Sequence, residues 1–421
     1  MERRDFIKVS MGAAAGAAFT QSCSPKNKDQ VSSDPINGLK PMTGEVVPIS
    51  DEERQGRIEK ARKMMVENNI AAIYLEGGTS LFYFTGVQWW NSERMFALVV
   101  PAQGELAWVC PAFEKDRALE LIRFGSDIRT WEEHESPYKR VAEIFSDRGI
   151  RTGRIGMEER VRFFLYDGIR KEAPQLEYIS ADPVTIGCRV IKSPAEIALM
   201  QKANDITLEA YKATVAMLEK GMTQHDIRSI SSQAHAALGA GGSIGAQIAE
   251  ASINPHGSIK RIELKEGDII LMDGGCSVDG YRSDISRTIV FGEPTQRQRE
   301  MWDLAKKAQT ALFDAAGVGV PCEDVDAAAR QVYVDYGFPG GYGLPGCPHR
   351  AGHGIGLDGH EWTYLVKGNQ QPMQPGMCFT NEPMLVVPEE FGIRLEDDFY
   401  ITEDGPKYFT QPSPSIDEPF A

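Results

Sequence analysis

An apolar run that ends in an aspartate and two glycines constrains the fold of this 421-residue chain more than any other stretch. Residues 269–272 are apolar and β-branched at their start, which predicts a buried strand. Asp273, Gly274 and Gly275 follow, and a second strand, residues 284–291, is expected to begin at Asp284. Such a hairpin brings two carboxylates to one end of a sheet, where like charges need a proton or a cation between them.

An aspartate beside glycine is most often an ordinary turn residue, so this pair alone is weak evidence. Further along the chain, His353 and His360 lie in one glycine-rich loop, although the chain has only seven histidines. Glu382 and Glu396 then follow in two expected strands, residues 377–387 and residues 393–402. The series Asp, Asp, His, Glu, Glu supplies four carboxylates and one imidazole, a donor set that suits hard or borderline divalent cations.

Length and composition define the class of protein. A chain of 421 residues is long enough for two domains with their own cores, and 42% hydrophobic and 25% charged residues are ordinary for a globular protein. A net charge of −15 argues against a nucleic-acid partner, because no basic excess is present to neutralise phosphates. The seven cysteines are scattered without a CxxC motif, and we expect buried free thiols.

The first residues are typical of a targeting segment. Adjacent arginines, Arg3 and Arg4, precede a short Ala- and Gly-rich apolar run, which is the layout of a twin-arginine export signal over residues 1–24. Residues 25–44 are polar and are expected to form a flexible tether. These features predict a periplasmic protein, and acylation at Cys23 would make it a membrane-anchored lipoprotein; simple cleavage near that residue is an equal alternative.

The rest of the chain divides into two expected domains. Residues 45–185 alternate strands with helices, which predicts a smaller α/β N-terminal domain. Residues 186–421 predict an α+β domain in which paired helices pack on antiparallel sheet. Ser50, Ser193 and Thr295 each begin a capping-box pattern at the start of an expected helix.

At this point the chain resembles the pita-bread metallopeptidases, which include Xaa-Pro aminopeptidases, prolidases and methionine aminopeptidases. The resemblance rests on the five-residue series above, on Phe82-Tyr83-Phe84-Thr85-Gly86 and on Arg394-Leu395-Glu396-Asp397. It implies an α+β fold with a C-terminal pita-bread (creatinase/aminopeptidase) domain after the α/β domain. It also implies two divalent metal ions (Mn, Co, Fe or Zn), with Asp284 and Glu396 bridging them and these ligands: Asp273, Asp284, His353, Glu382 and Glu396.

The resemblance also implies catalytic residues around the metals. His256 and His360 match the substrate-facing histidines of the family, and His360 would stabilise the tetrahedral intermediate. Glu382 would shuttle a proton besides its role as a ligand. Arg394 would orient a carboxylate ligand from the same face as Glu396. Two glycines after Asp273 are expected to leave room for metal and substrate, whereas His349 is expected to have a structural role.

The implied activity is removal of N-terminal residues from small Xaa-Pro peptides, with a metal-bridging hydroxide as the nucleophile and a homodimer as the assembly. Prolidases that take dipeptides often carry an arginine shortly after the second histidine; here Tyr364 stands about there, and the only cation nearby in sequence is Lys367. The sequence therefore favours an aminopeptidase, with dipeptidase activity left open. Alternatives are a non-peptidase of the same fold (a C–N hydrolase or a dimethylsulfoniopropionate lyase) and, least favoured, a metal-free binding protein.

Overall fold

The computed structural model describes residues 35–420 of the chain. The predicted export signal, Cys23 and the first part of the predicted tether lie outside these residues. Within the described part, no helix combines the length and the apolar character that a membrane crossing requires.

The N-terminal lobe is built on a six-stranded mixed sheet with the order β4-β3-β2-β1-β5-β6. The pairs β3-β4, β1-β5 and β5-β6 are parallel, and the pairs β1-β2 and β2-β3 are antiparallel. The strands are β1 (Ile70–Glu76), β2 (Ala97–Pro101), β3 (Ala107–Pro111), β4 (Asp127–Trp131), β5 (Arg154–Met157) and β6 (Glu177–Ser180).

Helices cover both faces of this sheet, because alternate residues of its central strand are apolar on both sides. Ala72 and Tyr74 of β1 belong to one buried cluster, with residues of α4 and α5, whereas Ile73 and Leu75 belong to another, with residues of α1. The helical segments of the lobe are α1 (Asp51–Glu67), α2 (Thr79–Thr85), η2 (Ala112–Glu114), α3 (Lys115–Leu121), α4 (Pro137–Asp147), α5 (Phe163–Glu172) and α6 (Asp182–Arg189). The short segment η1 (Pro35–Gly38) precedes them and packs against the C-terminal lobe.

The C-terminal lobe contains two larger sheets and a two-stranded ribbon. The first has the order β10-β8-β7, with β9 paired to β8, and the second has the order β12-β11-β13-β16-β17. The strands of the first sheet are β7 (Gly241–Ile248), β8 (Ile269–Val278), β9 (Tyr281–Arg282) and β10 (Ile285–Val290). Those of the second are β11 (Gly352–Gly354), β12 (Glu361–Leu365), β13 (Cys378–Asn381), β16 (Asp397–Thr402) and β17 (Gly405–Tyr408), and the ribbon is β14 (Leu385–Val387) and β15 (Phe391–Ile393).

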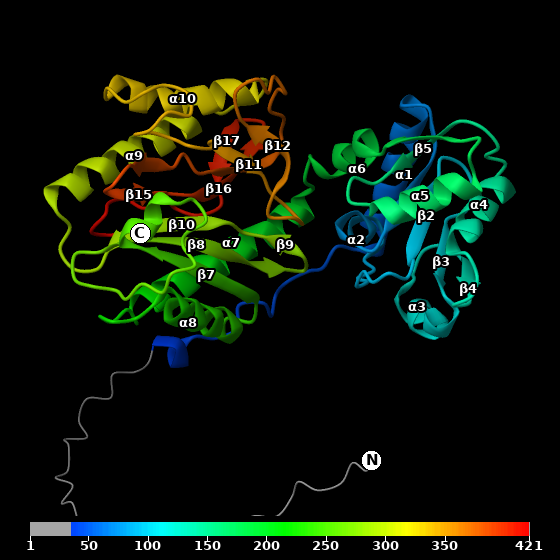
Figure 1. The fold of residues 1–421 in the computed structure, drawn as a ribbon, viewed down its shortest axis with the longest axis horizontal. Helices are drawn as coiled ribbons and strands as arrows, with labels where there is room; N and C mark the ends of the chain where they lie inside the picture. Colours follow the sequence, from blue (N-terminus) through cyan, green and yellow to red (C-terminus); the bar gives the residue numbers. More distant parts are fainter. Residues whose placement is uncertain (1–34, 421) are drawn as a thin grey trace, which may run out of the picture. The chain divides into compact units, whose positions relative to one another are not determined.

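The helices of this lobe are α7 (Pro194–Val215), α8 (Gln224–Ala237), η3 (Ala249–Ile253), α9 (Gln296–Ala315) and α10 (Cys322–Asp335). Helices α7 and α8 pack on the first sheet, and α9 and α10 pack on the second, so the two sheets lie between two helical layers (Figure 1). The predicted capping boxes at Ser193 and Thr295 are present, each stabilising its helix by about 1 kcal/mol. The predicted α+β fold class is confirmed.

The prediction of a flexible tether over residues 25–44 is wrong for the part that begins at Pro35. Residues from Pro35 onward do not form a free linker, because Ile36, Leu39 and Met42 pack against the core of the C-terminal lobe. The backbone N–H of Met42 also donates to the carbonyl of Leu238 at 2.8 Å. Composition suggested flexibility, but these three apolar side chains pack against the core.

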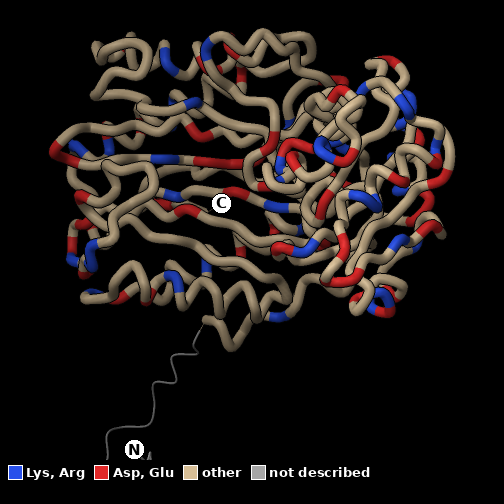
Figure 2. Tube along the Cα trace, turned by 45° about the vertical axis from the view of Figure 1, so that its right-hand side comes forward, with Lys and Arg blue, Asp and Glu red and all other residues tan. Residues whose placement is uncertain are grey.

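Acidic and basic positions are interspersed along the trace (Figure 2). The cysteines among the described residues are all buried and free of disulfides, in agreement with the prediction.

Candidate metal centre and active site

The first aspartate lies inside a strand and not at its end. Strand β8 continues through Asp273, Gly274 and Gly275. A Cβ atom at Gly274 would lie 2.2 Å from the carbonyl oxygen of Ser243, and one at Gly275 would lie 1.9 Å from that of Ser283. The glycines therefore allow neighbouring backbones to approach β8, and the expectation that they leave room for metal and substrate is wrong.

The second aspartate directly precedes β10, and its backbone N–H donates to Oδ2 of Asp398 at 3.0 Å. Strand β10 pairs with β8 so that Ser286 lies opposite Asp273. The Ser286 hydroxyl is 3.2 Å from Oδ1 of Asp273 and 2.6 Å from Oε2 of Glu396. Ser286 was missed in the sequence, although its position two residues after Asp284 places it on the same strand face.

Both glutamates lie where an expected strand is interrupted. The predicted strand over residues 377–387 is divided into β13 and β14, and Glu382 lies in the gap, followed by Pro383, which has no N–H for a ladder. The predicted strand over residues 393–402 is divided in the same way, and Glu396 precedes β16. The Glu396 carboxylate lies against Ser286 of the first sheet at 2.6 Å, and that of Glu382 lies 3.5 Å from Nε2 of His353.

His353 on β11 presents a lone pair to the carboxylates. Its backbone N–H donates to Oγ1 of Thr380 at 3.1 Å, and its Nδ1 is 3.0 Å from the carbonyl of Gly354. Because a carbonyl only accepts, Nδ1 carries the proton and Nε2 does not. Nε2 lies 3.5 Å from Oε1 of Glu382 and 4.0 Å from Oδ2 of Asp284, and burial lowers the pKa of His353 to about 3.

The pKa values of the carboxylates show that their negative charges are unfavourable in this arrangement. Burial, followed by the charges of Glu396 and Asp273, raises the pKa of Asp284 well above its ordinary value. Burial also raises the pKa of Glu382 to about 8, in spite of the opposing effect of Arg394. A neutral imidazole lone pair and several buried carboxylates facing one another require protons or metal ions between them.

The donor atoms are close enough for two neighbouring cations. Residues 35–420 contain three groups of candidate ligands. The first consists of three carboxylates, and the second contains His353 and shares Glu396 with the first. The third contains His360. Within each group the ligand atoms lie within 4.8 Å of one another: Asp273, Asp284 and Glu396; His353, Glu382 and Glu396; Asp284, His353 and His360. The residues present therefore fit a pair of divalent ions.

Arg394 is 5% exposed and stands among these carboxylates. Its Nη2 forms an ion pair with Oδ2 of Asp273, and its Nε donates to Oγ of Ser286 at 2.9 Å. Its Nη1 is 3.8 Å from Oε2 of Glu382, and its Nε is 3.6 Å from Oε2 of Glu396. Arg394 thus contacts three of the candidate metal ligands at once.

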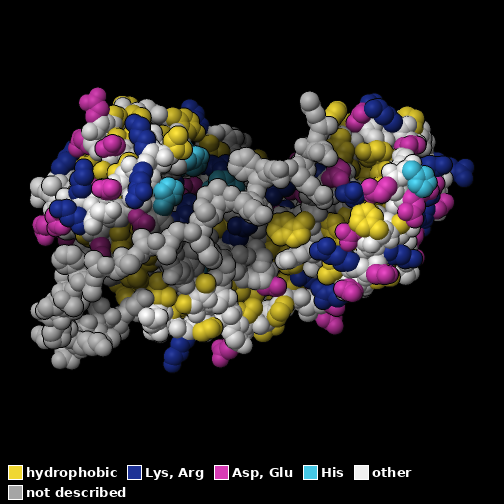
Figure 3. Space-filling model, turned by 60° about the horizontal axis from the view of Figure 1, so that its bottom comes forward, with side chains coloured by type: hydrophobic (Ala, Val, Ile, Leu, Met, Phe, Trp, Pro, Cys, Tyr) yellow, Lys and Arg dark blue, Asp and Glu magenta, His cyan; other side chains and the backbone are white. Residues whose placement is uncertain are grey.

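A cavity of about 500 Å³ opens over the cluster. Every metal ligand and catalytic residue that we predicted from the sequence lines this cavity, including His256, His360 and Arg394. Histidine side chains gather on this lobe in the space-filling view (Figure 3). Three further residues, Pro255, His349 and Arg350, also line the cavity and were given no such place from the sequence.

The His349 ring lies in the wall of this cavity in a neutral form. Its Nδ1 donates to the carbonyl of Arg350 at 2.6 Å, so the unprotonated nitrogen is Nε2. Nε2 is buried and has no hydrogen-bond partner among residues 35–420. Burial lowers the pKa of His349 to about 4, which keeps this nitrogen an acceptor at neutral pH.

His360 has the opposite tautomer. Nη2 of Arg350 lies 3.2 Å from Nδ1 of His360, and because a guanidinium only donates, Nδ1 accepts and Nε2 carries the proton. Burial and the charge of Arg350 lower the pKa of His360. The ring lies against that of His353, with 4.0 Å between centroids. A neutral His360 therefore offers Nε2–H as a hydrogen-bond donor beside the metal cluster.

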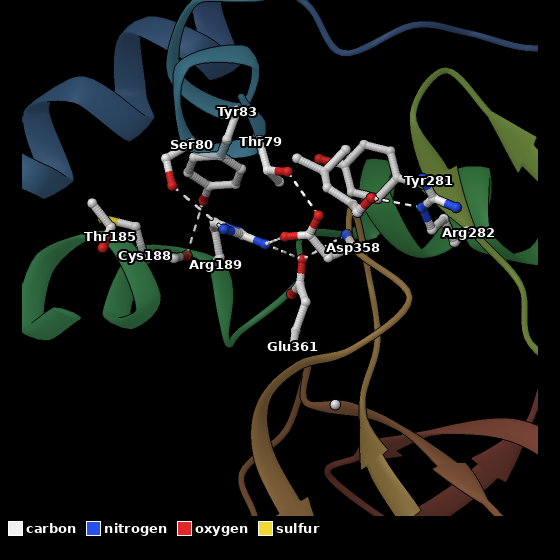
Figure 4. A network of polar contacts seen from close by, with 12 residues as sticks. Thr79, Ser80, Tyr83, Thr185, Cys188, Arg189, Tyr281, Arg282, Asp358 and Glu361 are labelled. Atoms are coloured by element: carbon white, nitrogen blue, oxygen red, sulfur yellow. Dashed lines mark hydrogen bonds and ion pairs between the residues drawn. The ribbon is translucent and has the colours of Figure 1, made fainter. Parts of the chain in front are cut away.

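The loop that carries His360 is held by a buried ionic network (Figure 4). Arg189, at the end of α6, donates from Nη2 to Oδ2 of Asp358 at 2.7 Å and to Oε1 of Glu361 at 2.5 Å. Lys192 donates to Oε2 of Glu361 at 2.9 Å, and Thr79 of the N-terminal lobe donates to Oδ1 of Asp358 at 2.7 Å. His360 lies between the two anchored carboxylates, so its position depends on this network.

Comparisons with known proteins agree with this geometry. Residues 198–403 match metallopeptidase family M24, and residues 57–191 match the creatinase/prolidase N-terminal domain. The Xaa-Pro dipeptidase of Lactobacillus helveticus is 30% identical over 359 residues, which cover 84% of this chain and 96% of that protein.

Among solved structures, a dipeptidase from Pyrococcus horikoshii OT3 is 30% identical with a TM-score of 0.78, covering 84% of this chain and 98% of that one. An X-Pro aminopeptidase from Thermotoga maritima MSB8 is 25% identical with a TM-score of 0.70, covering 81% of this chain and 96% of that one. The chain therefore belongs to metallopeptidase family M24 and carries the creatinase/prolidase N-terminal domain of that group.

Proposed function

We propose that this metallopeptidase, whose cofactor is a pair of divalent metal ions, cleaves the bond between an N-terminal residue and a following proline. The observation that carries the proposal is the single cavity that joins the Asp–Asp–His–Glu–Glu cluster to a neutral His360 donor. In this proposal the two ions would be held by the side chains that the structure brings together: Asp273, Asp284, His353, Glu382 and Glu396. The names of several relatives support the Xaa-Pro substrate class.

When bound, the ions would activate a water molecule and polarise the scissile carbonyl. The side chains of the chain supply the remaining parts of the reaction. Nε2–H of His360 donates to the carbonyl oxygen as negative charge develops on it, which stabilises the transition state more than the ground state. Glu382 accepts the proton of the attacking water and delivers it to the leaving nitrogen. Arg394 keeps the carboxylates of Asp273, Glu382 and Glu396 in position during these steps.

A peptidase and a non-peptidase enzyme of the same fold are separated by a direct assay. Protein stripped by a chelator is reloaded with Mn²⁺, Co²⁺ or Zn²⁺ and incubated with Ala-Pro-Ala, with Ala-Ala-Ala as the matched control, and products are identified by mass spectrometry. Release of alanine from Ala-Pro-Ala and not from Ala-Ala-Ala is expected. A protein that holds two metal ions, leaves every Xaa-Pro peptide intact and instead converts creatine or dimethylsulfoniopropionate would overturn the proposal.

A further inference from the structure

The ring of His360 has few contacts of its own. It is exposed, it makes one side-chain hydrogen bond among residues 35–420, with Arg350 at 3.2 Å, and it lies against the ring of His353. Gly359 directly precedes it, and a Cβ atom at Gly359 would meet a single atom within 4 Å, Cδ of Arg282 at 4.0 Å. A glycine in open space leaves the backbone free to move unless the neighbouring residues hold it. The position of His360 therefore depends on the residues on either side of this pair.

Asp358 and Glu361 enclose Gly359 and His360 in a turn with two fixed ends. The backbone N–H of Asp358 donates to Oε1 of Glu361 at 3.2 Å, which closes the turn. Nη2 of Arg189 lies between the two carboxylates, at 2.7 Å from Oδ2 of Asp358 and 2.5 Å from Oε1 of Glu361. Because both ends are held, Gly359 has little freedom left and the backbone of His360 is fixed.

The carboxylate of Asp358 is held by the N-terminal lobe. Thr79, the first residue of α2, donates from Oγ1 to Oδ1 of Asp358 at 2.7 Å (Figure 4). Arg160, which follows β5, donates from Nη1 to the same oxygen at 2.9 Å, and Arg189 of α6 donates to the other oxygen. In the described part of the chain these are the three donors to the carboxylate, and all of them belong to the N-terminal lobe. Asp358 thus connects a lobe that carries none of the candidate metal ligands to the turn that carries His360.

A displacement of His360 would act on the chemical step. In the proposed function its Nε2–H donates to the carbonyl oxygen as negative charge develops there, and such a contact is stronger in the transition state than in the ground state. Hydrogen bonds weaken steeply when their angle departs from linear, and a misplacement of ~1 Å can lower a rate about 100-fold. Loosening the support of Asp358 should therefore lower kcat and leave KM nearly unchanged.

We propose that Asp358 is a positioning residue for His360, and that through Asp358 the N-terminal lobe of the same chain sets the rate of the chemical step. This inference rests on the proposed function. It gives Thr79 and Arg160 a part in catalysis that requires no contact with metal or substrate. The sequence could not show this link, because Thr79 and Asp358 are 279 residues apart.

The test uses matched substitutions at the two ends of helix α2 in the metal-loaded full chain, with Ala-Pro-Ala as substrate. Thr79→Val removes the hydroxyl that donates to Asp358 and keeps the shape of the side chain. It should lower kcat about 10-fold, with KM and metal content within about 2-fold of wild type. Thr79→Ser keeps the hydroxyl and should retain the wild-type kcat.

Thr85→Val is the matched control. Thr85 ends the same helix, is fully buried and donates to the carbonyl of Leu81 at 2.7 Å, but it has no hydrogen bond with Asp358. This variant should lower the melting temperature and keep the wild-type kcat, and calorimetry checks that each variant is folded at the assay temperature. Asp358→Asn removes the charge that Arg160 and Arg189 contact and should lower kcat about 100-fold. If that variant does not fold, Thr79→Val decides the question alone.

Each other outcome has a definite meaning. A folded Thr79→Val protein with the wild-type kcat would overturn this inference, while cleavage of Ala-Pro-Ala by the wild-type protein would leave the proposed function standing. Equal losses of kcat in Thr79→Val and Thr85→Val would show a merely structural effect and would overturn it as well. A rise in KM as large as the fall in kcat would place the effect on substrate binding, with the same consequence. If the loaded wild-type protein leaves Ala-Pro-Ala intact, the proposed function itself fails, and this inference fails with it.

Discussion

Replacing Glu361 by glutamine removes the charge at the centre of the network that positions His360. Glu361 is 6% exposed and accepts hydrogen bonds from Arg189 at 2.5 Å and Lys192 at 2.9 Å. Glutamine keeps the size and shape of the side chain. Arg189 keeps Asp358 as a partner, but Lys192 loses its ion pair with Glu361 in a buried site. We therefore expect Glu361→Gln to destabilise the protein and to displace the loop that carries His360.

The magnitude follows from two independent estimates. The charges of Lys192 and Arg189 outweigh the effect of burial and lower the pKa of Glu361 from 4.5 to about 2, which corresponds to ~3 kcal/mol. Removing one partner of a buried ion pair costs about 3–5 kcal/mol. Because the folded-state pKa is depressed, this stabilisation is present above the unfolded-state value of 4.5 and is lost as the pH falls toward 2.

The assay is urea denaturation of metal-loaded protein at pH 7 and at pH 4, with kcat/KM measured in parallel. Glu361→Gln should lower the free energy of unfolding by ~3 kcal/mol at pH 7, and the difference from wild type should shrink at pH 4. Glu390→Gln is the matched control, because its pair with Arg297 is exposed and should change stability by less than about 1 kcal/mol. A Glu361→Gln variant as stable as wild type at pH 7, or a difference that grows on acidification, would refute the role of the network.

The remaining predictions concern metal removal, Arg394 and export. Burial raises the pKa of Glu382 to about 8, so the metal-free folded protein should lose stability as the pH rises from 4.5 to 8. Added metal should abolish this dependence of stability on pH. Calorimetry that shows no pH dependence in the metal-free protein would contradict the prediction. Arg394→Lys keeps the charge but loses the fork that spans the carboxylates, so we expect kcat to fall about 10- to 100-fold with the metal content unchanged; an unchanged kcat would argue against an orienting role. Replacing Arg3 and Arg4 by lysine should leave the precursor in the cytoplasm by cell fractionation, and undiminished export would count against a twin-arginine signal.

The candidate ligands, which the structure brings together in one cavity, could be predicted from the sequence because local backbone features mark them. Asp273 precedes glycines, Glu382 precedes a proline, and His353 lies between glycines, so each carries its own signal. The reason for the glycines after Asp273 could not be read, because it depends on the backbones of Ser243 and Ser283, which approach only in the folded sheet. The sequence pattern shows where glycines occur, but only the tertiary structure shows which backbone atoms lie against them.

Arg350 illustrates the second limit of the sequence. Lys367 is closer to Tyr364 along the chain, but the antiparallel pairing of β11 and β12 brings Arg350 to the aromatic ring. The packed segment around Met42 illustrates a third limit, since its polar composition hid the few apolar side chains that attach it to the core. In each case the missing information is a contact between residues distant in sequence.

The central proposal is that two metal ions would be held by donor groups that share Asp284 and Glu396, and metal stoichiometry tests it most directly. Chelator-treated wild-type protein is titrated with Mn²⁺ and with Zn²⁺, and bound metal is measured by elemental analysis beside peptidase activity. The account predicts two ions per wild-type chain, and loss of tight binding at both positions together with activity in Asp284→Ala. An Asp284→Ala protein that still binds two ions tightly and cleaves peptides at the wild-type rate would contradict it.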